Sequence, residues 1–176
     1  EYNGVKVFTS GGRDATEEVT KDIEDQISLI SKSDIKTMDY EKALASGLIT
    51  VINPQNNYID SILKNIDSES IKNKNLKILL DPMYGVSKTT LQTILLTCRC
   101  NVDVIHDRHD TLFGGRLPSP NSSTLTHLSQ LVVQGGYDLG IATDGDADRI
   151  GLIDSSGRFI HPNDILVLLY YYLHEY

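Results

Sequence analysis

The chain has 176 residues, of which 40% are hydrophobic, and it carries a formal net charge of −8. This length and apolar content suffice for a folded domain with its own core. The acidic balance argues against a nucleic-acid partner, which requires a basic face. No apolar run approaches the ~20 residues of a membrane-spanning helix. We therefore expect neither nucleic acid nor a membrane as a partner.

The cysteines and the N-terminal residue indicate the setting of the chain. Cys98 and Cys100, the only cysteines, are separated by one residue. This spacing fits neither a zinc ribbon nor a redox-active Cys-x-x-Cys pair. Reduced thiols are typical of the cytoplasm, so we expect a cytoplasmic protein. Because the chain begins with Glu1 rather than Met, we expect it to be part of a longer protein.

Residues 1–75 are predicted to form an N-terminal portion of the chain. A strand is expected over residues 2–9, where Val5 and Val7 flank Lys6. Helices are expected over residues 16–31, 39–46 and 54–66, and a further strand over residues 48–52. The polar residues 67–75 then indicate a boundary with the rest of the chain.

From residue 76 onwards, strands and helices alternate regularly. Strands are expected over residues 76–81, 101–106 and 137–143, and a strand–turn–strand over 150–160. Helices are expected over residues 86–97, 124–134 and 163–173. Strands separated by helices pair in parallel. We therefore predict an α/β fold: a three-layer α/β/α sandwich with a mixed, mostly parallel sheet, which binds ligands at the carboxyl ends of its strands.

Three aspartates at alternate positions follow the predicted strand 137–143: Asp144, Asp146 and Asp148, with Arg149 directly after them. Their like charges repel one another, so a bound cation would stabilise the segment. We expect the alternation to put the three carboxylates on one side of an extended loop. Carboxylate oxygens with no His or Cys nearby favour Mg²⁺ over Zn²⁺. We call residues 144–149 the aspartate loop.

Three other structures share features with the aspartate loop. An EF-hand begins with the same spacing but needs Gly at its sixth position and Glu at its twelfth, where this chain has Arg149 and Ser155. A phosphatase with an aspartate nucleophile also carries Asp-x-Asp after a strand, but Asp148 stands where that class has Thr or Val. A solvated acidic turn is the third alternative, and such turns are seldom found between two apolar strands.

Four segments resemble, in order, the α-D-phosphohexomutase family of phosphoglucomutases, phosphomannomutases and their relatives. The most specific is TDGDADR, residues 143–149, which resembles the metal-binding loop of the family. EYNGVKV, residues 1–7, is similar to the segment after its Thr-x-Ser-His-Asn-Pro phosphoserine loop. DPMYG (81–85) and LFGGRLPSPNSSTL (112–125) resemble its Asp-Pro-Met-His-Gly turn and its Phe-x-Gly-Arg-x-Pro-x-Pro linker. Tyr84 and Arg13 depart from the usual His and Pro.

The resemblance implies a phosphoglucomutase-domain-like fold. Residues 1–176 would form the second domain of a four-domain enzyme, with strand 2–9 entering from the first domain. The implied reaction moves phosphate between the 1- and 6-hydroxyls of a hexose, through a phosphoserine and a sugar bisphosphate. Hexose phosphate and the remaining domains would be the partners, and glucose 1,6-bisphosphate would be an activator. We expect glucose as the sugar, with mannose or glucosamine next. Without the phosphoserine, we expect the isolated chain to be inactive.

The resemblance also implies roles for individual residues. Asp144, Asp146 and Asp148 would hold one Mg²⁺ ion, which other divalent ions can replace. Arg149 would neutralise charge on the transferring phosphoryl group. Lys6 matches a lysine proposed in the family as general acid/base, and the alternative is an exposed strand lysine.

The loop predicted over residues 107–123 is long enough to suggest a function. Within it, Arg116 either reaches a phosphate or holds the loop, and we favour the structural role. The histidines show no metal-binding spacing; they stand at positions 106, 109, 127, 161 and 174. A non-catalytic metal-binding or interaction module remains the alternative to an enzyme domain.

Overall fold

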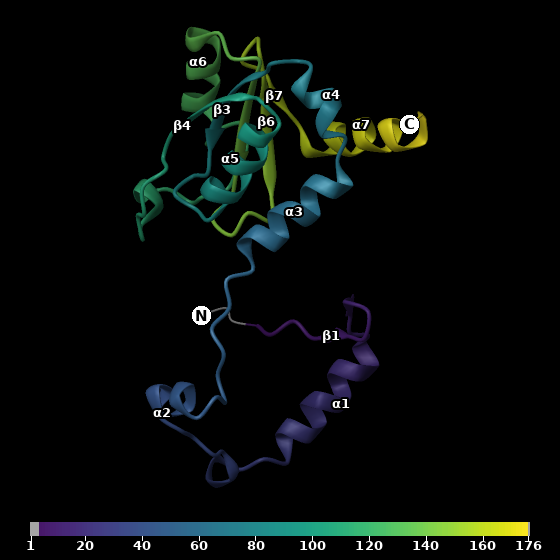
Figure 1. Cartoon of the computed structure of the whole chain (residues 1–176), viewed down its shortest axis with the longest axis vertical. Helices are drawn as coiled ribbons and strands as arrows, with labels where there is room; N and C mark the ends of the chain where they lie inside the picture. The colour runs from purple at the N-terminus through teal and green to yellow at the C-terminus, as the bar shows by residue number, and fades with distance from the viewer. Residues whose placement is uncertain (1–3, 176) are drawn as a thin grey trace. The chain divides into compact units, whose positions relative to one another are not determined.

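A computed structural model of the chain describes residues 4–175 (Figure 1). The chain divides between Ile52 and Asn53 into two compact units, which we call the N-terminal unit and the sheet unit. The division lies earlier than the polar residues 67–75 indicate. The reason is that α3 (Gln55–Asn65) packs against a helix of the sheet unit and contributes Leu63 to its core.

The N-terminal unit contains a short hairpin followed by helices. Strand β1 (Phe8–Thr9) pairs antiparallel with β2 (Arg13–Asp14). The turn between them has Gly11 and Gly12 at φ of 86° and 73°, a region that glycine enters without steric cost. Then come α1 (Glu17–Ser28), the 3₁₀ helix η1 (Lys32–Asp34) and α2 (Tyr40–Ala45).

The strands predicted for this unit are largely wrong. The strand expected over residues 2–9 is reduced to β1, because residues 4–7 are irregular and residues 2 and 3 lie outside the described residues. No strand forms over residues 48–52, despite their β-branched side chains. Instead, the N–H of Leu48 donates to the carbonyl of Ala43 and closes the turn after α2. A strand needs a paired neighbour, so β propensity alone does not produce one.

Helix α1 is confirmed, but its apolar face is uncovered within the described residues of this unit. Glu17 and Glu18 lie in its first turn, where negative charge is favoured by the helix dipole. The exposed residues of the face include Ile23 and Ile27. Ala43 is the one buried hydrophobic residue among the described residues up to position 52. This unit therefore has almost no hydrophobic core of its own.

The sheet unit is built on five strands in the order β4–β3–β5–β6–β7. They are β3 (Lys77–Asp81), β4 (Asn101–Val104), β5 (Leu139–Thr143), β6 (Ile150–Asp154) and β7 (Phe159–Ile160). β3 pairs in parallel with β4 and β5, whereas β6 pairs antiparallel with β5 and β7. The sheet is mixed, as predicted, and the change of direction occurs between β5 and β6.

Helices cover both faces of this sheet (Figure 1). Helix α5 (Ser87–Thr97) lies on one face and α6 (Thr126–Gly135) on the other. The unit also contains α4 (Ser68–Lys72), the 3₁₀ turn η2 (Phe113–Gly115) and α7 (Pro162–Glu175), which runs away from the sheet in Figure 1. Because side chains alternate along a strand, neighbours in β3 enter different cores. Leu80 packs with Leu91 of α5, whereas Leu79 packs with Leu128 of α6. The three-layer α/β/α arrangement is confirmed.

Cys98 and Cys100 are both buried and unpaired, and both belong to the core beneath α5. Burial, together with the neighbouring Cys98 thiol, raises the pKa of the Cys100 thiol. A protonated buried thiol packs as a small apolar group. The two residues are therefore structural, which agrees with the expectation of reduced thiols.

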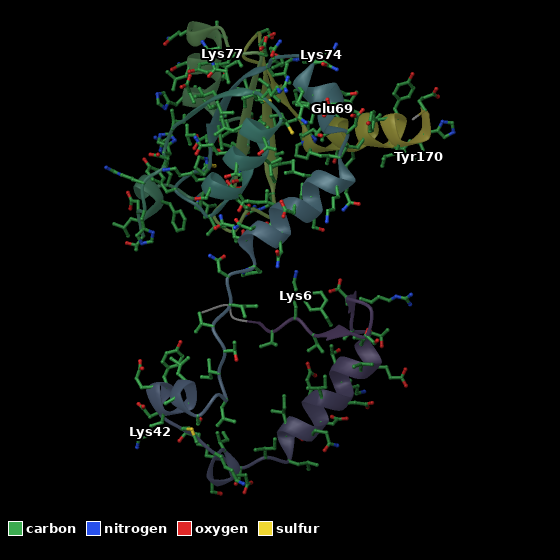
Figure 2. The ribbon with its side chains drawn as sticks, in the orientation of Figure 1. Lys6, Lys42, Glu69, Lys74, Lys77 and Tyr170 are labelled. Atoms are coloured by element: carbon green, nitrogen blue, oxygen red, sulfur yellow. The ribbon has the colours of Figure 1, made fainter. Side chains whose placement is uncertain are left out.

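Helix α7 carries apolar residues around its whole circumference. Its exposed residues include Leu166, Val167, Leu168, Leu169, Tyr170, Tyr171, Tyr172 and Leu173. Figure 2 shows the Tyr170 side chain standing away from the helix. Among the described residues, no helix is both long and apolar enough to cross a bilayer. Helices with this pattern are typical of the interiors of larger proteins.

Replacing Leu80 with Ala is expected to lower the free energy of unfolding of the sheet unit by about 2–5 kcal/mol. The Leu80 side chain is fully buried in β3, so its removal leaves a cavity between the sheet and α5. Urea denaturation followed by circular dichroism measures the change. Leu117→Ala is the matched control, since Leu117 is exposed. Equal stability of the two variants would contradict the core described above.

Candidate metal centre

The aspartate loop is a tight turn between two neighbouring strands. β5 ends at Thr143 and β6 begins at Ile150, and these two residues pair across the ladder. Within the turn, the N–H of Ala147 donates to the carbonyl of Asp144 (3.2 Å). Ala147 itself has a φ of 64°, which is uncommon for a residue other than glycine. The loop is therefore folded back on itself, not extended as the alternation of aspartates suggests.

This turn brings the three aspartates together. One carboxylate oxygen from each of Asp144, Asp146 and Asp148 lies within 4.8 Å of the others. Asp144 is buried, whereas Asp146 and Asp148 are exposed to solvent. Three oxygen donors, with no His or Cys in the group, have the chemistry that hard divalent cations prefer. The residues present thus fit Mg²⁺, with an open side facing solvent.

Arg149 is the immediate counter-charge of this cluster. Its backbone N–H and its Nε donate to the two carboxylate oxygens of Asp144, at 3.0 and 2.7 Å. Its Nη1 donates to the hydroxyl of Ser119 (3.2 Å). Nε also lies 3.7 Å from an oxygen of Asp148. The arginine therefore binds the buried aspartate closely and approaches an exposed one.

The pKa values of two carboxyls in the cluster are shifted in opposite directions. Burial opposes ionisation of Asp144, but hydrogen bonds from Arg149 outweigh it and lower the pKa of that carboxyl. The pKa of Asp148 is raised, first by a hydrogen bond with Asp144 and then by the negative charges of Asp146 and Asp144. Crowded carboxylates share protons when no cation separates them. This pattern is expected of a group of acids that lacks sufficient positive charge.

The turn after β3 supports the aspartate loop from beneath. A Cβ at Gly85 would lie 2.5 Å from the carbonyl oxygen of Gly145 and 2.8 Å from its Cα. The N–H of Val86 donates to the same carbonyl (3.1 Å). Next to it, the buried hydroxyls of Ser87 and Thr143 are 2.7 Å apart. Gly85 and Ser87 are not among the predicted site residues, although the glycine that ends DPMYG marks this close approach.

Asp81 and His106 hold the same turn at its base. The buried Asp81 accepts from the N–H of Met83 (2.8 Å) and lies 3.0 Å from Nδ1 of His106. The N–H of Tyr84 donates to the carbonyl of His106 (2.9 Å), and the two rings are 5.0 Å apart. Met83, Tyr84 and His106 all have positive φ. His106 thus has a structural role.

Two further predicted site residues belong to other segments of the chain. Arg116 is exposed in the long loop that follows η2. Lys6 is exposed in the irregular segment before β1 of the N-terminal unit (Figure 2). Their predicted roles therefore stay predictions.

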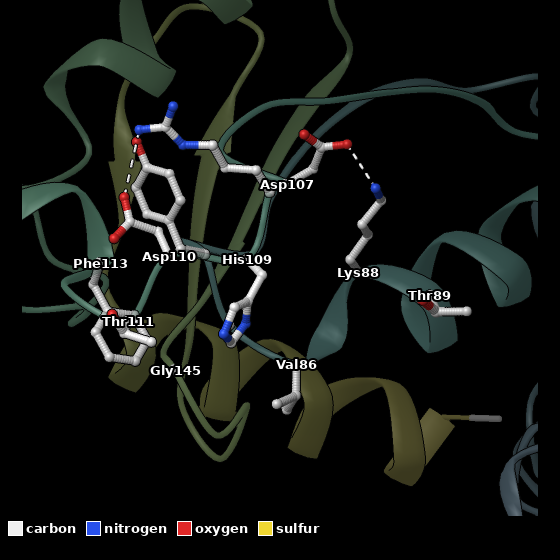
Figure 3. A pocket seen from close by; sticks show the side chains of 12 residues that line it. Val86, Lys88, Thr89, Asp107, His109, Asp110, Thr111, Phe113 and Gly145 are labelled. Atoms are coloured by element: carbon white, nitrogen blue, oxygen red, sulfur yellow. Dashed lines mark hydrogen bonds and ion pairs between the residues drawn. The ribbon is translucent and has the colours of Figure 1, made fainter.

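An open cleft of about 660 Å³ lies beside the aspartate loop and is lined in part by Gly145. Figure 3 shows that its charged side chains face one another in pairs. Lys88 Nζ lies 2.6 Å from Asp107, and Arg108 Nη2 lies 3.4 Å from Asp110. Because these cations are already paired, the cleft offers an anion less positive charge than its lining suggests.

The chain is similar to known sugar-phosphate mutases in a family model and in individual sequences. Residues 56–157 match the family model described as phosphoglucomutase/phosphomannomutase, alpha/beta/alpha domain II. The phosphoglucosamine/phosphogalactosamine mutase of Sulfurisphaera tokodaii is 34% identical over 161 residues, which cover 89% of this chain and 34% of that protein. The phosphoglucomutase/phosphomannomutase of Thermococcus kodakarensis is 30% identical over 169 residues, covering 96% of this chain and 36% of that protein. The chain thus spans about a third of the length of these relatives.

A solved structure supports the fold. The crystal structure of a phosphoglucomutase/phosphomannomutase family protein from Burkholderia thailandensis aligns with a TM-score of 0.58 and 20% identity. The alignment covers 73% of this chain and 29% of that one. At this identity the likeness concerns the fold alone, and it agrees with the mixed sheet and its covering helices.

Gly85→Ala is expected to disturb the aspartate loop, because the added methyl would meet backbone atoms of Gly145 that cannot move independently of the loop. We expect a loss of about 1–3 kcal/mol in the free energy of unfolding of the sheet unit. Chemical denaturation measures it. Gly4→Ala is the control, since a Cβ there meets nothing within 4 Å. Unchanged stability and unchanged amide spectra of residues 144–149 would sink this account of Gly85.

Proposed function

Because the chain belongs to the phosphoglucomutase/phosphomannomutase family, we propose that it supplies the Mg²⁺-binding loop of a phosphohexomutase. The observation that carries this proposal is the convergence of Asp144, Asp146 and Asp148, with one oxygen of each within 4.8 Å of the others. The longer protein would interconvert hexose 1-phosphate and hexose 6-phosphate by phosphoryl transfer to and from a serine outside this chain.

The three aspartates would hold Mg²⁺, and other divalent ions of similar size could replace it. When bound, the ion would stabilise negative charge on a phosphoryl oxygen as a Lewis acid. The carboxylates also orient Arg149, whose guanidinium lies against the cluster at the solvent-exposed side. Its permanent positive charge would attract the phosphoryl group and stabilise the charge that develops during transfer.

Lys6 is proposed as the proton carrier of the reaction. As a neutral amine it would accept the proton of the attacking sugar hydroxyl, and as an ammonium it would protonate the leaving oxygen. Its exposure within the N-terminal unit is compatible with access to substrate. For Arg116 we keep the structural role first and a phosphate contact second.

The substrate class is a hexose phosphate, and its identity is a narrower proposal. The sequence predicts glucose. One of the two relatives is named a phosphoglucosamine/phosphogalactosamine mutase and the other a phosphoglucomutase/phosphomannomutase. Because the relative with the higher identity of these two acts on amino sugars by its name, we place glucosamine phosphate first and glucose phosphate second.

The alternatives to an enzyme domain are less well supported. An aspartate nucleophile needs a free carboxylate oxygen, but both oxygens of Asp144 accept hydrogen bonds from Arg149 and the residue is 1% exposed. A non-catalytic metal-binding module would keep the cluster without the reaction. The cytoplasmic location, the activation by glucose 1,6-bisphosphate and the place of this chain in a four-domain protein stay predictions.

Mg²⁺ binding by the 176-residue chain is expected to be weak, with a dissociation constant on the order of millimolar. The reason is that three protein ligands leave the ion largely hydrated, and the proposed phosphoserine would contribute its oxygen from outside this chain. Isothermal titration calorimetry measures it, with Asp146→Ala expected to abolish binding. Asp60→Ala, which changes an exposed aspartate of α3, is the control. Micromolar affinity that survives Asp146→Ala would contradict the proposed site.

The function itself is tested by mutase assays on the longer protein. Glucosamine 1-phosphate, glucose 1-phosphate and mannose 1-phosphate are compared in the presence of Mg²⁺, and product is detected as the 6-phosphate. We expect turnover of at least one sugar, loss of at least about a hundredfold in Asp146→Ala, and no turnover by the 176-residue chain alone. The proposal fails if Asp146→Ala retains the full rate or if the chain alone is active.

A further inference from the structure

Arg149 reaches beyond the acidic cluster to a residue that the proposed reaction does not use. Three of its nitrogens are hydrogen-bond donors: the backbone N and Nε bind Asp144, and Nη1 binds the hydroxyl of Ser119. Ser119 belongs to the long loop before α6, thirty positions away in the chain. One guanidinium therefore links two loops while it neutralises a buried carboxylate.

Arg149 binds both carboxylate oxygens of Asp144, which is the buried member of the cluster. Asp144 is 1% exposed, and each of its carboxylate oxygens accepts one hydrogen bond from Arg149. A buried carboxylate without a positive partner would be strongly destabilised. A divalent cation and the guanidinium would therefore both stabilise the carboxylate of Asp144. Binding of either one weakens the attraction of this carboxylate for the other.

Ser119 is held in place by contacts that do not involve its hydroxyl. Its carbonyl accepts from the hydroxyl of Thr124 (2.6 Å) and from Nδ2 of Asn121 (3.3 Å). Pro118 and Pro120 flank it in the sequence, and proline restricts the backbone on either side. The hydroxyl of Ser119 is thus a fixed anchor for Nη1 of Arg149.

We propose that Arg149 is an internal counter-cation that binds Asp144 when the aspartate loop is free of metal, and we call this contact the latch. Ser119 is the positioning residue that holds the guanidinium of Arg149 in place. The latch competes with the divalent cation, so it lowers the affinity of the loop for metal. This inference rests on the proposed function, because it requires the loop to bind a divalent cation.

The latch depends on the shape of arginine as well as on its charge. A guanidinium presents donors in a fixed planar fork, so Nε and Nη1 can bind Asp144 and Ser119 together. A lysine ammonium keeps the charge but is a single point at the end of a flexible stem. Arg149→Lys therefore separates the effect of the latch from the effect of charge.

The test is a Mn²⁺ titration of the 176-residue chain followed by electron paramagnetic resonance, which counts free Mn²⁺ directly. Arg149→Lys and Ser119→Ala are each expected to tighten Mn²⁺ binding about threefold, the equivalent of one lost hydrogen bond. Ser119→Thr, which keeps the hydroxyl, is expected to match the original chain. Arg158→Lys is the matched control, because Arg158 also bonds an aspartate through Nε, at 3.0 Å from Asp154, outside the cluster.

The outcomes separate this inference from the function on which it rests. Mn²⁺ binding that both Arg149→Lys and Ser119→Ala leave unchanged overturns the latch and leaves the metal site intact. Absence of Mn²⁺ binding to the original chain at millimolar Mn²⁺ contradicts the metal site on which the proposed function rests, while the mutase assay on the longer protein tests that function separately. The latch is then judged by the Nε–H signal of Arg149 in ¹H–¹⁵N spectra of the metal-free chain. A sharp signal that is lost in Ser119→Ala and kept in Ser119→Thr supports the latch, and its absence from the original chain overturns it.

Discussion

The ion pair between Arg149 and the buried Asp144 is the interaction on which the rest of the site depends. Asp144 is the first residue of the aspartate loop and is buried, so its charge must be balanced inside the protein. Arg149 provides that balance from the last position of the same turn and brings the start and end of the loop together. Asp146 and Asp148 are then left exposed to solvent, where the proposed cation would reach them.

The topology of the sheet explains why this turn exists at all. Parallel strands are connected by crossovers that carry a helix, whereas antiparallel neighbours can be joined by a short turn. The sheet changes from parallel to antiparallel between β5 and β6, so the chain can reverse within six residues there. The same edge holds the end of β3, whose turn contacts the loop through Gly85 and Val86. The site thus lies where two strand ends and a change of strand direction meet.

The N-terminal unit shows where local patterns lose their predictive value. The spacing of isoleucines identified α1, but residues 48–52 form no strand although their composition favours one. A helix satisfies its own backbone hydrogen bonds, while a strand depends on a neighbour. The sheet unit was predicted more fully, since its strands are paired within the described residues. The three aspartates predicted as ligands do converge in space, but Gly85, Ser87 and Ser119 were missed because each acts through a contact with a distant segment.

The sequence alone determined the α/β class, the three aspartates and the arginine that follows them, and the family that these residues resemble. These features are local, since alternation, spacing and charge can be read along the chain. Only the tertiary structure decided that the loop is a tight turn, that Asp144 is buried while its neighbours are exposed, and that Ser119 anchors Arg149. Burial and long-range hydrogen bonds depend on which segments meet in space, and that is settled by packing of the whole sheet unit.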